Sequence, residues 1–111
     1  MISSDVIRGY NDTMILYLLL DEPSYGYEIS KKIRELSNDK YVIKETTLYS
    51  AFKRMESNGY IAAFLGSDYK ITEEGKKPYR EKCKEWEITK EVIEKFIVRE
   101  NDHEYNQKLS W

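Results

Sequence analysis

Residues 45–61, ETTLYSAFKRMESNGYI, decide the fold, because this stretch joins an apolar helix face to a polar one. Leu48, Phe52 and Met55 recur at the spacing of a single helix face, which predicts a helix over residues 46–57 packed on a core. The opposite face carries hydroxyls, a phenol and two adjacent cations, at Thr46, Thr47, Tyr49, Ser50, Lys53 and Arg54. A solvated surface and a surface for a polar partner both agree with this face, so the flanking elements decide between them.

Helical patterns precede this stretch. Residues 4–20 have helical periodicity, with Ser4 as the expected cap and the Asp-Glu-Pro sequence at 21–23 as the stop. A second helix is expected from Ser24, its predicted cap, to residue 36. Its buried stripe is expected to consist of Tyr25, Ile29, Ile33 and Leu36. Residues 41–43 are too few for more than an extended link.

A hairpin pattern and a long helix follow. Asn58-Gly59 is typical of the left-handed turn that ends a helix. Residues 60–65 and 69–72 predict two strands around a tight turn at 66–68. Thr72 then marks the start of one long helix that continues through residues 76–100, with Pro78 tolerated near its beginning.

This order of elements predicts a mainly α fold with a small β-hairpin. We expect a winged helix-turn-helix domain over residues 1–72, followed by a long C-terminal dimerisation helix and tail over residues 73–111. In this layout the third helix enters the major groove of DNA and the hairpin contacts the flanking backbone. The polar face of the third helix is therefore interpreted as a DNA-contacting surface.

Charge and composition exclude several classes of protein. The net charge of the 111 residues is −2, yet the acidic residues concentrate at both ends and leave the middle basic, as a DNA-facing surface requires. The single cysteine and the lack of a signal-like N-terminus or a membrane-length apolar run predict a cytoplasmic location. The only histidine, His103, has no catalytic set or metal-ligand spacing around it, so neither an enzyme nor a cofactor is expected.

Three blocks of the sequence resemble the signature blocks of PadR-like transcriptional regulators. They are YGYEI at 25–29, TLYSAFKRMESNGYI at 47–61 and YKITEEG at 69–75, and the similarity extends over roughly residues 10–97. The resemblance implies a homodimer that represses transcription at a pseudo-palindromic operator. It also implies DNA-contacting roles for Tyr27, Thr47, Tyr49, Ser50, Lys53 and Arg54. Thr46 on the polar face of the helix and Lys70 on the hairpin are further expected DNA contacts.

Three positions depart from the family pattern. The turn before Tyr69 lacks the cations usual there, which leaves only Lys70 for a wing contact with DNA. Arg54 has an alternative role as an ion-pair partner of Glu56. Lys44 stands where a Ser or Asn cap is usual, so Glu45 or Thr46 would have to cap the third helix.

The terminal helix has an apolar seam. Tyr79, Cys83, Trp86, Lys90, Ile93 and Ile97 follow alternating steps of four and three, and Val92 and Phe96 widen the stripe. A domain of this size cannot cover the stripe, so we expect a two-fold dimer that presents two third helices about 34 Å apart. The residues expected in the dimer interface are Tyr79, Cys83, Trp86, Ile93, Phe96 and Ile97.

Trp86 has two interpretations. It is either an anchor of the dimer interface or, as the resemblance to short-tailed multidrug-sensing members implies, one of two rings that sandwich a planar aromatic ligand. Lys90 would then favour a neutral or anionic ligand, unless its stem only follows the seam. Cys83, one turn before Trp86, completes the candidate ligand site, as a small buried hydrophobe or as a crosslinking thiol.

A different function also agrees with the sequence. The acidic net charge and the wing without cations are compatible with a winged-helix module for protein interaction, or for plasmid or phage replication and partition. The TLYSAFKR sequence favours the repressor.

Overall fold

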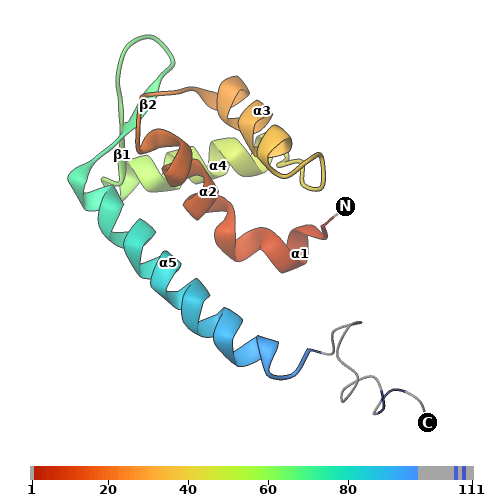
Figure 1. Cartoon of the computed structure of the whole chain (residues 1–111). Coiled ribbons are helices and arrows are strands. Elements are labelled where there is room, and N and C mark those ends of the chain that lie inside the picture. The colour runs from red at the N-terminus through yellow and green to blue at the C-terminus, as the bar shows by residue number, and fades with distance from the viewer. Residues whose placement is uncertain (1, 98–106, 108, 110–111) are drawn as a thin grey trace.

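The computed structural model describes residues 2–97, 107 and 109 of the chain (Figure 1). Its elements are α1 (Ser4–Ile7), the 3-10 helix η1 (Arg8–Tyr10), α2 (Asn11–Leu19), α3 (Gly26–Leu36), α4 (Glu45–Ser57), β1 (Ile61–Ala63), β2 (Tyr69–Ile71) and α5 (Glu73–Glu94). The expected mainly α fold with one hairpin is confirmed. Figure 1 shows α5 leaving the hairpin, passing α2 and extending away from the other helices.

The N-terminal helix is not continuous, contrary to expectation. It is divided into α1, η1 and α2, and the cap is Ser3 rather than Ser4, since Ser3 Oγ accepts a hydrogen bond from the amide of Asp5 at 3.2 Å. The break falls at Gly9, and glycine is about 1 kcal/mol less favourable than alanine inside a helix. The tighter 3-10 turn changes the direction of the chain between α1 and α2.

Ser24 does not cap α3. Its backbone pairs with Tyr69 of β2 in an antiparallel bridge, with N–H to O distances of 3.0 and 2.7 Å, and α3 begins two residues later. The link between α2 and α3 thereby acts as a short third strand beside the hairpin. The expected stripe of α3 is also corrected: Ile29 and Ile33 are buried, whereas Tyr25 and Leu36 are exposed.

One apolar cluster lies between α2, α3, α4 and the base of the hairpin. Leu48, Phe52 and Met55 are all at most 2 % exposed, which confirms the predicted inner face of α4. The cluster consists of Ile15, Leu16, Leu19, Ile29, Ile33, Tyr41, Ile43, Leu48, Ala51, Phe52, Met55 and Ile61. Burial of these side chains fixes which face of α4 remains outside.

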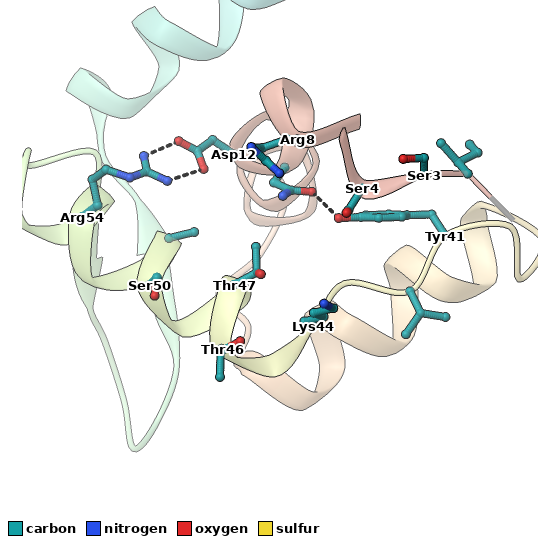
Figure 2. Close-up of a pocket in the computed structure, with 14 residues that line it drawn as sticks. Ser3, Ser4, Arg8, Asp12, Tyr41, Lys44, Thr46, Thr47, Ser50 and Arg54 are labelled. Carbon is teal, nitrogen blue, oxygen red and sulfur yellow. Dashed lines mark hydrogen bonds and ion pairs between the residues drawn. The ribbon is translucent and has the colours of Figure 1, made fainter. Parts of the chain in front are cut away.

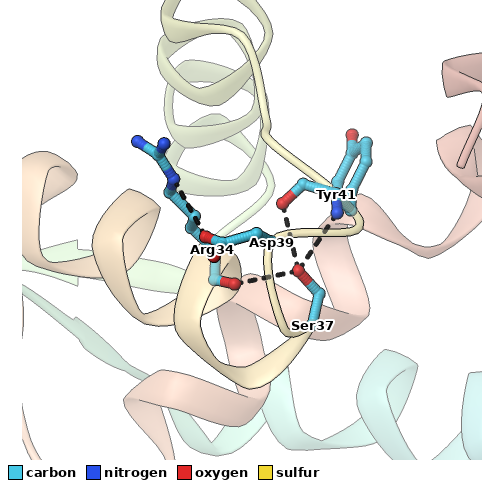
Figure 3. A network of polar contacts seen from close by, with 4 residues as sticks. All are labelled: Arg34, Ser37, Asp39 and Tyr41. Atoms are coloured by element: carbon cyan, nitrogen blue, oxygen red, sulfur yellow. Dashed lines mark hydrogen bonds and ion pairs between the residues drawn. The ribbon is translucent and has the colours of Figure 1, made fainter. Parts of the chain in front are cut away.

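The turn between α3 and α4 is held by a polar network (Figure 3). The Ser37 hydroxyl lies 3.1 Å from the carbonyl oxygens of Arg34 and Tyr41, and its oxygen accepts the Tyr41 N–H. Asn38 and Asp39 take up left-handed backbone angles, with φ of 54° and 61°. This network fixes the path by which the chain leaves α3 and enters α4.

A buried hydrogen bond connects the same turn to α2. The Tyr41 hydroxyl donates to Asn11 Oδ1 at 2.7 Å, and both side chains are buried. The buried amide oxygen and the phenol satisfy each other here, so neither of these two groups is buried without a partner.

The hairpin and the start of α5 agree with the predictions. Gly59 has a φ of 78°, as its expected role at the end of α4 requires. Ile61 pairs with Ile71 and Ala63 with Tyr69. The Thr72 side chain caps α5 by accepting the amide of Gly75 at 3.0 Å.

The end of α5 differs from the prediction. The helix stops at Glu94, and the next amides bond to carbonyls three residues back, as in Phe96 N–H to Ile93 O at 2.9 Å. Residues 98–100 of the expected helix lie outside the described residues.

Candidate nucleic-acid interface

The outer face of α4 is a polar strip with no packing role in this chain. Thr46, Ser50 and Lys53 are all exposed and lie opposite the buried face of the helix. The strip presents two hydroxyls and one ammonium group along consecutive turns. Hydroxyls and cations of this kind contact phosphates and base edges when a helix enters a groove of DNA.

One flank of the strip faces α3. A Cβ atom on Gly26 would lie 2.9 Å from the Tyr49 hydroxyl and 3.2 Å from its ring, so the phenol rests on this glycine at the start of α3. Tyr49 also meets Phe52 edge to face, with ring centroids 5.8 Å apart. Tyr27, on the first turn of α3, is 70 % exposed. Tyr49 therefore presents its ring next to the strip, and Tyr27 is exposed on the adjoining helix α3.

The other flank of the strip faces a groove lined by both polar and apolar side chains (Figure 2). The groove has a volume of about 910 Å³ and separates α4 from the N-terminal segment and from residues 41–44. Thr47, Ser50 and Arg54 line it from α4, and Thr46 borders it at the first turn. Of the predicted DNA-contacting residues, four thus lie along this groove.

Arg54 is bound to α2 and not to Glu56. Its guanidinium makes two hydrogen bonds to the two carboxylate oxygens of Asp12, one of them at 2.9 Å (Figure 2). The hydrogen bonds that Arg54 donates to Asp12, together with the negative charge of Asp12, raise the pKa of Arg54 against the opposing effect of burial. The pairing corrects the expected ion pair and occupies the two-pronged donor that a phosphate would otherwise use.

Lys70 lies on the wing, away from the α4 strip. Its ammonium is 5.6 Å from the centre of the Phe64 ring. Phe64 and Leu65 at the wing tip are 47 % and 71 % exposed. The tip is therefore apolar, whereas cations are usual there in the family pattern.

The predicted interface residues of α5 form two groups. Tyr79 and Cys83 are half-buried, and Tyr79 packs against the core of the domain. Trp86, Ile93, Phe96 and Ile97 are each at least 47 % exposed. The apolar stripe therefore remains largely uncovered over the second half of the helix.

The candidate ligand site is only partly assembled in one chain. Cys83 and Trp86 line a cavity of about 500 Å³ between α1, α2 and α5, and Trp86 meets Tyr10 edge to face at 5.7 Å. Lys90 is exposed and does not line this cavity within the part of the chain that the structure describes.

Several residues at the site were missed by sequence reasoning. Asp12, Arg8 and Ser3 come from the N-terminal segment and reach the groove beside α4. No local motif connects them with α4, because the contacts arise only when α2 packs on it. A basic residue in an otherwise acidic N-terminal segment was the one available signal.

Within residues 2–97, 107 and 109, no three His, Cys, Asp or Glu side chains are grouped as metal ligands. In the same part of the chain, no helix combines the length and the apolar character needed to span a bilayer.

Comparison with known proteins gives consistent matches. Residues 15–81 match the model of the transcriptional regulator PadR-like family. An uncharacterised protein of Lysinibacillus sphaericus is 44% identical over 105 residues, covering 87% of this chain and 96% of that protein.

Solved structures agree with these matches. A transcriptional regulator from Clostridium thermocellum is 60% identical, with a TM-score of 0.84 over 88% of this chain and 100% of that one. A PadR family transcription regulator from Clostridium difficile is 36% identical, with a TM-score of 0.70 over 81% of this chain and 100% of that one.

The family match and the fold lead to one assignment. More than half of the chain is covered by the family model, and the relatives align over nearly their full length. Members of this family regulate transcription, so the chain is not an enzyme. The chain belongs to the PadR-like family of transcriptional regulators.

Proposed function

We propose that this chain is a DNA-binding repressor that acts in the cytoplasm as a homodimer on a pseudo-palindromic operator. The observation that carries the proposal is the polar strip of Thr46, Ser50 and Lys53, which α4 exposes while its other face fills the core. The strip enters the major groove, Tyr49 and Tyr27 contact the adjoining backbone, and Lys70 contributes from the wing. Residues 1–72 form the DNA-binding unit and residues 73–111 hold the two copies together.

The uncovered stripe on α5 supports the dimer. Trp86, Ile93 and Phe96 expose apolar surface that a second copy of the helix would bury. A two-fold arrangement places the two α4 helices about one turn of DNA apart, roughly 34 Å. Dimerisation therefore sets the half-site spacing of the operator.

DNA binding is tested by fluorescence anisotropy on the duplex upstream of the chain's own gene, over a series of salt concentrations. Lys53→Ala should weaken binding to every sequence and reduce the slope of log K against log salt by about one. Lys84→Ala, an exposed lysine on α5, is the control with the same change of charge. Wild-type protein that prefers the upstream duplex no more than a random one would contradict the repressor.

A planar aromatic ligand at Trp86 is the second part of the proposal. The exposed half of the Trp86 ring would face its counterpart across the two-fold axis and stack on a neutral or anionic ligand, with Lys90 beside it. Because Trp111 is the only other tryptophan, a Trp111→Phe protein isolates the fluorescence of Trp86. Saturable quenching by planar aromatics should occur in this protein. Equal quenching in a Trp86→Ala protein that retains Trp111 would contradict the site.

A further inference from the structure

The groove beside α4 carries more positive charge than the polar strip on the outer face of α4. Three cations line it, Arg8, Lys44 and Arg54, against a single acid, Asp12. Glu45, the acid on the first turn of α4, does not belong to the lining. The groove thus has a net positive lining with exposed hydroxyls at its edge.

The cations differ in their availability. Arg54 is held by two hydrogen bonds to Asp12 on α2. Among the residues that the structure describes, Arg8 pairs with Asp5 alone, three residues away, and the two side chains are 74% and 81% exposed. Exposed pairs of this kind are weak, and a phosphate can replace the carboxylate. Lys44 is exposed at the start of α4. The available positive charge of the groove therefore belongs to Arg8 and Lys44.

The position of the groove relative to α4 indicates its occupant. A helix in a major groove about 12 Å wide has a sugar-phosphate backbone on each side. Tyr49 and α3 occupy one side of the strip, and the groove occupies the other. The backbone of the second strand would thus run along Arg8 and Lys44. Figure 2 shows Arg8, Ser4 and Lys44 around this groove, together with Thr46 and Thr47 of α4.

We propose that the groove between the N-terminal segment (residues 3–8) and α4 binds the phosphate backbone of the second DNA strand. Arg8 and Lys44 neutralise the phosphates, and the hydroxyls of Ser3 and Ser4 donate to their oxygens. Asp12 keeps Arg54 out of this contact. The inference rests on the proposed function, because it extends the same DNA surface onto a segment outside the helix-turn-helix.

The test uses full-length Arg8→Ala, Lys44→Ala and their double variant in the anisotropy assay, with Lys84→Ala as the control. Each single variant should reduce the salt slope by about one and the double by about two, equally on operator and random duplexes. Asp5→Asn should act in the opposite direction and strengthen binding, since it frees Arg8. Melting temperatures close to that of the wild type show that the exposed changes leave the fold intact.

The outcomes separate the two proposals. If Arg8→Ala and Lys44→Ala keep the wild-type salt slope while Lys53→Ala lowers it by one unit, the polar strip contacts DNA and the groove does not. If the wild-type protein binds no duplex, the proposed function fails and the inference fails with it. If Asp5→Asn weakens binding as much as Arg8→Ala does, the pair supports the local fold and the phosphate contact is refuted.

Discussion

Gly75 has no room for a side chain. A Cβ atom there would lie 2.0 Å from the carbonyl oxygen of Tyr60, which accepts the Thr72 amide at 3.0 Å. The backbone immediately before β1 and the first turn of α5 therefore approach each other directly. This contact is the physical reason for glycine in the YKITEEG block, where the hairpin passes into α5.

We predict that Gly75→Ala destabilises the protein by several kcal/mol. The carbonyl is backbone and cannot move aside cheaply, and overpacking of a closed site typically costs about 1–3 kcal/mol or more. Urea unfolding followed by circular dichroism measures the change. Gly9→Ala is the control, because its Cβ would meet only the Lys82 ammonium at 3.8 Å. Equal stability of the two variants would contradict the prediction.

The substitution Gly26→Ala should destabilise the protein less than Gly75→Ala. Its added Cβ would meet the flexible end of Tyr49 at 2.9 Å, and a phenol can rotate away from such a contact. We expect Gly26→Ala to change the free energy of unfolding by less than about 1 kcal/mol, within the range of mild substitutions. DNA affinity should fall more than in Tyr49→Phe, because the whole ring moves. Anisotropy and urea unfolding on both variants check the two halves of this prediction.

At the scale of elements, the Asp12–Arg54 pair connects α2 with α4. The same helix α2 also lines the cavity next to Trp86 through Thr13 and Met14, and Tyr10 of η1 lines it just before α2 begins. A movement of α2 relative to α5 would therefore also move Asp12 and its partner Arg54, because Asp12 lies on the same helix. The Asp12–Arg54 pair thus connects the helix that lines the candidate ligand site with α4, next to the polar strip.

We predict a measurable coupling between these two residues. A double-mutant cycle with Asp12→Ala and Arg54→Ala should give about 0.5–1 kcal/mol in urea unfolding, the upper part of the range for partly exposed pairs with two-pronged geometry. The Arg34–Asp39 pair, which makes a single hydrogen bond, should give less in the same measurement. A coupling free energy near zero would show that the pair does not stabilise the packing of α4 on α2.

The elements that the sequence predicted are those set by local periodicity. The buried face of α4, the turn at Gly59 and the Thr72 cap were predicted from neighbouring residues and are confirmed. The bridge of Ser24 and the partner of Arg54 were not, because both depend on residues more than forty positions away. Of the candidate interface, the strip on α4 was therefore predictable, whereas the groove formed with the N-terminal segment was not.

At the scale of the whole molecule, α5 has more apolar surface than one chain covers. Ile88, Val92, Ile93 and Phe96 are all about half exposed or more. A stripe of this length on a helix that extends beyond the domain favours self-association. In the proposed dimer, the half-site spacing of the operator depends on how two such helices cross.

We predict that Ile93→Glu converts the dimer to a monomer. A charge buried in an apolar interface is costly, whereas the side chain is 51% exposed in a single chain, so the fold should tolerate the change. Size-exclusion chromatography with light scattering measures the mass, and operator affinity should fall with it. Lys84→Ala, with the same change in net charge, should remain dimeric. A wild-type protein that is monomeric at micromolar concentration would contradict the dimer.

The pairing of Ser24 with Tyr69 has a consequence for motion. Two amides from distant parts of the chain donate to each other's carbonyl groups, so neither can become accessible to solvent alone. Their protons should exchange with deuterium at a common rate, set by one cooperative opening of the hairpin against the α2–α3 link. Site-resolved hydrogen–deuterium exchange would then measure the rate at which the wing detaches from the α2–α3 link in a single event. Residues at the wing tip should exchange earlier.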